Sequence, residues 1–167
     1  MRERFSVFQP WTSTVARLFL VGVFALAGWP KLTDQEATVR SVRAFDLLPE
    51  ALVRPFAFGL PLLELSLALL LLLGLGTRLA SGLVGCLLIM FLFGIAMAWA
   101  RGLSIDCGCF GNTGTEVPDP VPGYIKDLFR DTGFLIVAAF LVRWPRSRFS
   151  LDNLLQLYPE PVPAGRR

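Results

Sequence analysis

The chain has no histidine and only three cysteines among its 167 residues, and charged residues make up just 17% of it. The lack of histidine excludes, within this chain, His-ligated haem, His-containing zinc sites, Ser-His-Asp and Cys-His catalysis, and a histidine pH switch. Three cysteines are too few for a disulfide scaffold. The net charge is only +3 and the Lys and Arg residues form no basic stripe, which argues against a nucleic-acid partner.

Hydrophobic runs dominate what is present. Apolar residues make up 54% of the chain and its mean hydropathy is +0.58, whereas ordinary soluble domains are about 45–50% apolar. Because backbone polar groups in lipid must be satisfied within each segment, these runs predict helices. We therefore expect an all-α integral membrane four-helix bundle, forming a single domain over residues 1–167. Its spans are predicted at about 12–29, 55–73, 79–100 and 128–144, followed by a polar cytoplasmic tail over 145–167.

Four spans put both termini on the same side of the membrane. The cluster Arg143, Arg146 and Arg148 lies directly beside the last span, and positive charge favours the cytoplasmic side. We therefore predict a multi-pass protein of the cell (plasma) membrane with both termini in the cytoplasm. The first span is expected to be retained rather than cleaved as a signal peptide, because Arg17 interrupts its apolar run.

Two connections carry local signals. In the first outer loop, the run Thr33-Asp34-Gln35-Glu36 has the pattern of a capping box, which predicts a short helix through about Phe45 across the outer mouth of the bundle. The link from Gly74 to Thr77 is tight, so the second and third spans are predicted to be antiparallel neighbours.

The loop between the third and fourth spans contains the run Asp106-Cys107-Gly108-Cys109-Phe110-Gly111 and is predicted to face outward. A disulfide that closes a loop of one intervening residue restrains the unfolded chain very little, whereas a strained, exposed one exchanges readily. We therefore favour a redox role over a structural disulfide or a metal-binding pair. A closed zinc site needs four ligands, so no metal is assigned. Cys86 is predicted to lie about 30 Å away along the bundle axis, too far to join this site.

Charged residues are expected near the thiols. Lys31 ends the first predicted span, and Arg130 and Asp131 begin the last one on the same side. A nearby cation lowers a thiol pKa and so raises the thiolate fraction. Asp106 and Asp131 would oppose this effect, or could shuttle protons. The simpler interpretation of Lys31 and Arg130 is interfacial anchoring.

Two further charges, Arg17 and Glu64, fall inside the first and second predicted spans. Their predicted depths differ by about one helical turn, which two long side chains can bridge. An unpaired charge there is costly, so we predict an intramembrane pair or a protonated Glu64. A structural role is favoured over a proton or quinone path.

The chain resembles the methylamine-utilisation MauE and DoxX-like group of small four-span membrane proteins over about residues 12–144. The most specific matching piece is the Cys-Gly-Cys-Phe-Gly run over residues 107–111. The other pieces are Arg17 with Gly28 and Lys31, the run Leu60-Pro61-Leu62-Leu63-Glu64, Leu72-Leu73-Gly74, and Arg130-Asp131.

The resemblance implies a redox-associated membrane protein that helps exported partners acquire or exchange disulfides. MauE-like proteins are linked to maturation of methylamine dehydrogenase, whose small subunit is rich in disulfides, and are thought to act beside a thioredoxin-like partner. DoxX-like proteins are associated with membrane oxidoreductase complexes and sulfur compounds.

The preferred hypothesis is thiol–disulfide exchange at the outer membrane face, with Cys107 and Cys109 as the catalytic pair and a thioredoxin-like protein or exported client as partner. No cofactor is assigned, although a quinone is a candidate electron acceptor. The alternatives are a non-catalytic membrane assembly factor, or a quinone- or small-solute-binding subunit of an oxidoreductase complex centred on Arg17 and Glu64.

Overall fold

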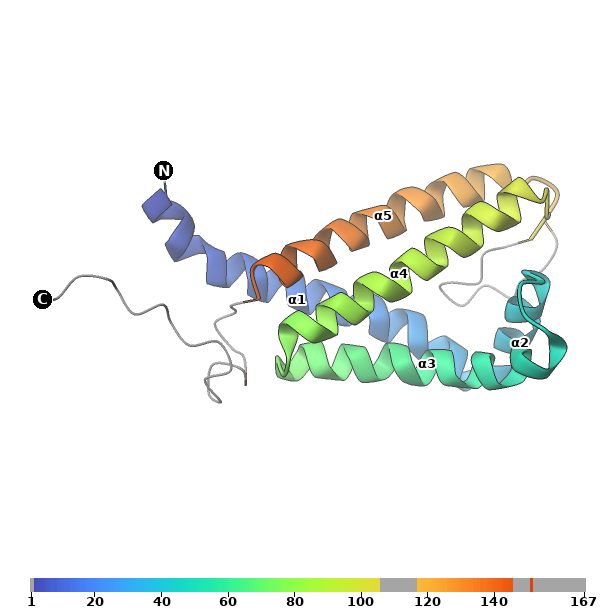
Figure 1. Ribbon diagram of the computed structural model, residues 1–167, viewed down its shortest axis with the longest axis horizontal. Coiled ribbons are helices and arrows are strands. Elements are labelled where there is room, and N and C mark those ends of the chain that lie inside the picture. The colour runs from blue at the N-terminus through green and yellow to red at the C-terminus, as the bar shows by residue number, and fades with distance from the viewer. Residues whose placement is uncertain (1, 106–116, 146–150, 152–167) are drawn as a thin grey trace, which may run out of the picture.

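The computed structural model describes residues 2–105, 117–145 and 151. These residues form five helices: α1 (Arg2–Thr33), α2 (Gln35–Ala44), α3 (Glu50–Leu73), α4 (Thr77–Ala100) and α5 (Val121–Arg143). The four long helices run along the molecule and α2 lies across one end of it (Figure 1). The all-α prediction is confirmed.

The core lies between two helix pairs. α1 packs along α3 and α4 packs along α5, and their facing sides bury a continuous apolar cluster that includes Leu20, Leu67, Leu71, Val84 and Leu141. A separate small cluster joins Val39 of α2 to Val53 and Ala57 of α3. The short helix is therefore seated on the first half of α3 rather than on the main core.

The connection between α3 and α4 is as tight as the sequence predicts. Gly74 and Gly76 have φ values of 64° and 57°, a left-handed conformation that glycine adopts without steric cost. The Gly74 N–H closes the last turn of α3 by donating to Leu71 O at 3.1 Å. The two helices meet at this turn and diverge toward the end that carries α2 (Figure 1).

The short helix α2 is confirmed, but its capping differs from the prediction. Asp34 is the N-cap, and its side chain accepts a hydrogen bond from Ala37 N at 2.9 Å. Thr33, predicted to open the capping box, instead donates to Pro30 O at 2.9 Å as the last residue of α1. The α1 helix therefore continues to the N-cap of the next helix, with no loop between them.

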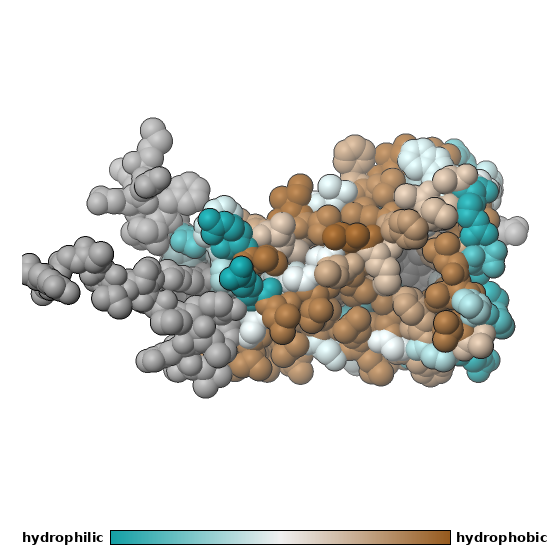
Figure 2. Space-filling view, in the orientation of Figure 1, coloured by the Kyte–Doolittle hydropathy of each residue, from teal (hydrophilic) through white to brown (hydrophobic). Residues whose placement is uncertain are grey.

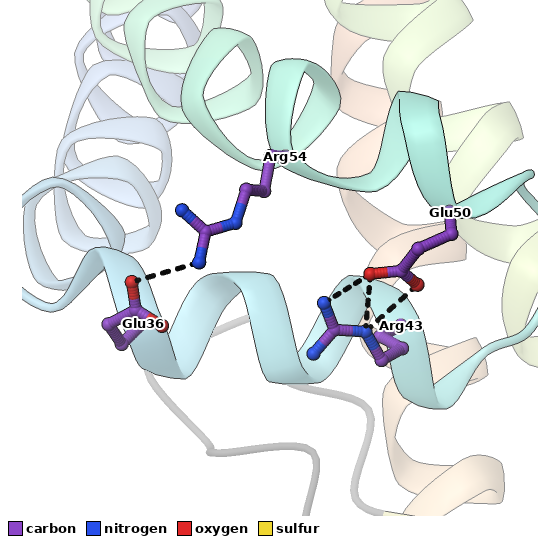
Figure 3. A network of polar contacts seen from close by, with 4 residues as sticks. All are labelled: Glu36, Arg43, Glu50 and Arg54. Carbon is purple, nitrogen blue, oxygen red and sulfur yellow. Dashed lines mark hydrogen bonds and ion pairs between the residues drawn. The ribbon is translucent and has the colours of Figure 1, made fainter.

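Two ion pairs fasten α2 to the start of α3 (Figure 3). Arg43 Nε donates to Glu50 at 3.0 Å, and Arg54 lies 3.8 Å from Glu36. The hydrogen bond from Arg43 to Glu50 also raises the pKa of Arg43 above its ordinary value, because it favours the charged guanidinium. All four side chains are exposed, so these pairs orient α2 more than they stabilise it.

Three helices are long and apolar enough to cross a membrane: Gln9–Thr33, Glu50–Leu73 and Thr77–Ala100. Large apolar side chains cover their outer faces, with Leu26 and Leu79 each 70% exposed, and Figure 2 shows hydrophobic residues across the middle of the visible face and hydrophilic ones at the α2 end. α5 is not among the three because five of its 23 residues are charged. It also begins at Val121, seven residues before the predicted span.

The packing of α1 on α3 depends on Gly28. A Cβ atom at this position would lie 3.0 Å from Leu65 Cγ and 3.2 Å from Glu64 Cβ, whereas one at Gly22 would meet nothing within 4 Å. We expect Gly28→Ala to force α1 and α3 apart and to lower the stability by about 1–3 kcal/mol. Gly22→Ala, the control on the same helix, should be neutral or stabilising by up to about 1 kcal/mol. Thermal unfolding in detergent measures both, and equal melting temperatures would contradict the close contact.

Candidate functional site

The most deeply buried ion pair in the described part of the chain joins Lys31 to Glu64. Lys31 Nζ lies 2.6 Å from Glu64 Oε1, with the side chains only 6% and 0% exposed. Lys31 belongs to the last turn of α1 and Glu64 to the middle of α3. Gly28 lies one turn before Lys31, and its missing side chain lets the Glu64 backbone approach α1 closely enough for this pair to form.

The predicted pair between Arg17 and Glu64 is therefore wrong. Arg17 is buried, but it precedes Lys31 by fourteen residues, or about 21 Å along α1. The prediction placed the outer ends of the first two spans level with each other. In the structure α1 ends two residues after Lys31, whereas α3 begins fourteen residues before Glu64, so the start of α3 extends beyond the end of α1. This stagger brings Lys31 opposite Glu64. Lys31 is consequently not an interfacial anchor.

A second group of charges lies on α5. Tyr124, Asp127 and Asp131 share the helix face that is buried in the bundle. Arg130 lies between the two carboxylates, with Nη1 2.7 Å from Asp127 and Nε 2.9 Å from Asp131. Arg130 and Asp131 thus lie about ten residues inside α5 instead of opening it, because the helix begins at Val121 and places Pro122 in its first turn, where proline is tolerated.

The two groups of charges face each other across a small cavity. Glu64 and Asp131 both line it, together with apolar side chains of α1, α4 and α5 that include Phe24, Leu88 and Phe134. Glu64 Oε2 and Asp131 Oδ2 are buried and have no hydrogen-bond partner among the described residues. An unsatisfied buried carboxylate oxygen is costly, so this geometry favours a proton or a water molecule between them.

The predicted redox residues Asp106, Cys107 and Cys109 lie outside the described residues. The chain on either side of them is described. Val117 N donates to Ser104 O at 2.9 Å, which joins the two sides of the loop at its base. Cys86, the third cysteine, is exposed on α4.

Tyr124 holds the start of this loop against α5. Its hydroxyl donates to Leu103 O at 2.8 Å and accepts from Ile105 N at 3.3 Å. Tyr124 and Ile105 are buried with Ile95 and Ala98 in one apolar cluster. The sequence analysis did not single out this tyrosine, and the only available signal was its spacing from Asp127 and Asp131 on one helix face. The base of the cysteine loop is thereby fixed to the end of the bundle that carries α2.

A larger cavity of about 430 Å³ opens at the same end, between α2 and the diverging helices α3 and α4. Lys31 is the one basic residue among its lining side chains. Its walls are mostly apolar and include Phe45, Phe56, Phe91 and Phe93. This cavity could not be predicted from the sequence, because it arises from the angle between two helices.

Arg101 closes the far side of the cavity by holding the segment that follows α2. Its guanidinium donates to Phe45 O at 3.1 Å and to Asp46 O at 3.0 Å, and it pairs with the Asp46 carboxylate at 2.8 Å. Asp46 has a φ of 47°, a left-handed conformation that aspartate tolerates better than most residues. α2 is therefore fixed at both ends, to α1 by Asp34 and to α4 by Arg101.

The outer faces are apolar, three helices are long enough to span a membrane, and the charges lie in the interior and at the two ends of the bundle. These features define an α-helical membrane protein. Residues 9–143 match the family described as "Methylamine utilisation protein MauE", and the chain belongs to this family. The resemblance to MauE is thus confirmed, while its DoxX-like part stays a prediction.

Curated relatives carry the same description. The chain is 47% identical over 105 residues to the methylamine utilization protein MauE of Methylorubrum extorquens, which covers 62% of this chain and 56% of the relative. It is 41% identical over 104 residues to that of Methylophilus methylotrophus, covering 62% and 55%, and 34% identical over 107 residues to that of Paracoccus denitrificans, covering 64% and 58%. The chain therefore matches little more than half the length of these relatives. No solved structure is significantly similar to it.

The buried pair makes a testable prediction about stability. Lys31→Met leaves the Glu64 carboxylate without its cation in an apolar interior, so we expect a loss of about 3–5 kcal/mol. The double variant Lys31→Met with Glu64→Gln removes both charges and should recover most of this loss. Arg54→Met, which breaks the exposed pair with Glu36, is the control and should cost at most about 1 kcal/mol. Thermal unfolding in detergent compares the three, and a double variant no more stable than Lys31→Met alone would contradict the pairing.

Proposed function

We propose that this protein exchanges thiols and disulfides at the membrane surface through Cys107 and Cys109, and so supports the maturation of an exported partner. The observation that carries the proposal is the fixed base of the loop that contains the Cys-Gly-Cys run. Tyr124 and the Ser104–Val117 hydrogen bond hold the two ends of this loop at the charged end of the bundle. A pair of cysteines one residue apart contributes little to stability, which favours exchange as their role.

The electrons and protons of this exchange balance between the client and the Cys107–Cys109 pair, with no further reactant. A client thiolate attacks one sulfur of the Cys107–Cys109 disulfide, the S–S bond breaks, and a mixed disulfide forms. The second client thiolate then attacks that mixed disulfide. The client gains a disulfide and loses two electrons and two protons, while Cys107 and Cys109 gain them as a dithiol.

The printed names of the relatives suggest the setting of this activity. We propose that the client belongs to methylamine utilisation and that a thioredoxin-like protein or the exported client itself is the direct partner. Lys31 lies in the last turn of α1, and Arg130 and Asp131 lie about ten residues into α5 from the loop. We propose that their charges influence the thiols of the loop.

We also propose that α5 is a fourth span and that both termini are cytoplasmic. Of the five charges that lower its hydropathy, Asp127 and Asp131 are buried and Arg130 pairs with both, while Phe129 is 78% exposed on its outer face. The Ser13 hydroxyl donates to Trp144 O at 3.0 Å, so the start of α1 and the end of α5 meet at one end of the bundle. A chain that leaves the bundle where it entered has crossed an even number of times.

The topology is tested by labelling in intact cells that express the Cys86→Ala variant, in which only the loop thiols remain. With a membrane-impermeant maleimide, we expect two labels to appear only after reduction, because the loop faces outward and holds a disulfide. Two labels without reduction would mean free thiols and a reducing role. Absence of labelling in intact cells, together with labelling after permeabilisation, would contradict the outward orientation.

The chemistry is tested by complementation of a Methylorubrum extorquens strain that lacks its own MauE. We expect the wild-type chain and Cys86→Ser to restore growth on methylamine, and the double variant Cys107→Ser with Cys109→Ser to fail, because it cannot exchange disulfides. Each single loop variant should accumulate a mixed disulfide that is visible on a non-reducing gel.

Equal amounts of each variant in the membrane are the necessary control, which an immunoblot provides. Growth supported by the variant without loop cysteines would overturn the exchange mechanism and leave a non-catalytic assembly factor as the function.

A further inference from the structure

We propose that the cavity of about 430 Å³ beside α2 binds the head group of a membrane quinone, and that this quinone is the oxidant that restores the Cys107–Cys109 disulfide. Binding itself depends only on the cavity. The role as oxidant rests on the proposed function, so the two are tested separately below.

The size and walls of the cavity suit a flat ring with an apolar tail. Its volume is within the range of small-molecule sites, roughly 300–1,000 Å³. Phe45, which follows α2, and three phenylalanines of α3 and α4 line it, and aromatic side chains pack well on the face or edge of a planar ring. Met90 adds a flexible wall that adapts to ring substituents.

The cavity is reached from the side of the bundle. Phe93, which is 60% exposed, stands with Met90 at its rim on the part of α4 that is predicted to lie in the membrane. Figure 2 shows the hollow in this face between α3 and α4, next to α2. A ligand can therefore enter from the lipid and leave a long apolar tail there, which favours a lipid-soluble ligand over one from the aqueous phase.

Lys31 supplies the polar contact at the inner wall. Its ammonium lies 5.2 Å from the centre of the Phe91 ring and has three donors, one of which is used by Glu64. Because Glu64 neutralises its charge, an anionic ligand gains little net attraction here, and Asp34 on the lining would oppose it. A neutral molecule with a carbonyl acceptor fits this combination, and a quinone has two carbonyl groups on a flat ring.

Proton donors lie directly behind Lys31. Glu64 connects the larger cavity, through its bond with Lys31, to the small cavity that it shares with Asp131. The unpartnered oxygens Glu64 Oε2 and Asp131 Oδ2 face that small cavity and can hold a proton between them. The three side chains thus form a continuous set of groups that can donate to a reduced quinone oxygen.

The cavity also touches the support of the cysteine loop. Phe45 lines the cavity and packs against the cluster formed by Ile95, Ile105 and Tyr124. Cys107 follows Ile105 by two residues, which limits the separation of their Cα atoms to about 7 Å. The reaction balances as dithiol plus quinone giving disulfide plus quinol: two electrons and two protons leave the sulfurs, one S–S bond forms, and both quinone oxygens become hydroxyls.

Binding is tested on the purified full chain with ubiquinone-2, a quinone that carries two isoprene units. We expect it to raise the melting temperature of the wild type. Gly94→Leu should weaken this binding at least tenfold, because a Cβ at Gly94 points at Phe45 across 3.8 Å and a longer side chain fills the cavity. Gly82→Leu is the matched control on the same helix, since a Cβ there meets nothing within 4 Å, and should bind as the wild type does.

Farnesol, an isoprenoid alcohol without a ring, distinguishes recognition of the quinone ring from non-specific binding of an apolar chain. We expect it to bind at least tenfold more weakly than ubiquinone-2, and the double variant Lys31→Met with Glu64→Gln to lose this preference. Equal binding of the two molecules, or equal binding of ubiquinone-2 by Gly94→Leu and Gly82→Leu, would overturn the quinone site.

The role as oxidant is tested with dithiothreitol as electron donor and ubiquinone-2 as acceptor. We expect the wild type to accelerate quinone reduction at least tenfold over the double variant Cys107→Ser with Cys109→Ser, which should still bind the quinone normally. Normal binding without such acceleration would overturn the role as oxidant while the binding site stands, and the exchange chemistry itself is decided by the complementation experiment. Acceleration by the cysteine-free variant would overturn the coupling between the site and the thiols.

Discussion

A buried charge is costly unless it is paired with an opposite charge, and the Lys31–Glu64 pair meets this requirement. The position of the helices around the proposed site depends on this pair. The pair fixes the last turn of α1 against the middle of α3, and Gly28 makes room for it. α2 follows immediately after Thr33, so its position over the bundle is set by where α1 ends. The roof of the larger cavity is thus a consequence of one ion pair and one missing side chain.

The remaining charges extend this arrangement across the bundle. Asp131 of α5 lines the small cavity together with Glu64 of α3. The two helix pairs, α1 with α3 and α4 with α5, therefore meet at polar groups around this cavity and at an apolar core elsewhere. Buried charges are expensive in a membrane protein and are found mainly where they line a path or a site. Asp127, Arg130 and Asp131 place such groups along the half of α5 that follows the cysteine loop, and this is the physical basis for assigning function to this part of the bundle.

Hydropathy predicted the helices well and their mutual register poorly. The long apolar runs, the short helix after Asp34 and the tight turn at Gly74 were all visible in the sequence, because each depends on residues close together in the chain. The partner of Glu64 depends on how far α3 slides along α1, which a hydropathy profile does not contain. The signal that carried this information was Gly28, three residues before Lys31 and therefore on the same helix face. α5 began earlier than predicted for a related reason, since its charges were counted without regard to the face that they occupy.

The structure also explains why the two kinds of chemistry proposed here belong at the same end. A quinone reaches the protein only through the lipid, whereas an exported client reaches it only from the aqueous side. Phe45 contacts both sites, since it lines the lipid-accessible cavity and packs on the cluster that supports the cysteine loop. Arg101 holds the backbone at this residue and joins it to the end of α4. A transfer of electrons from client to membrane carrier would then need to cross only the wall that Phe45 forms between the cavity and the support of the loop.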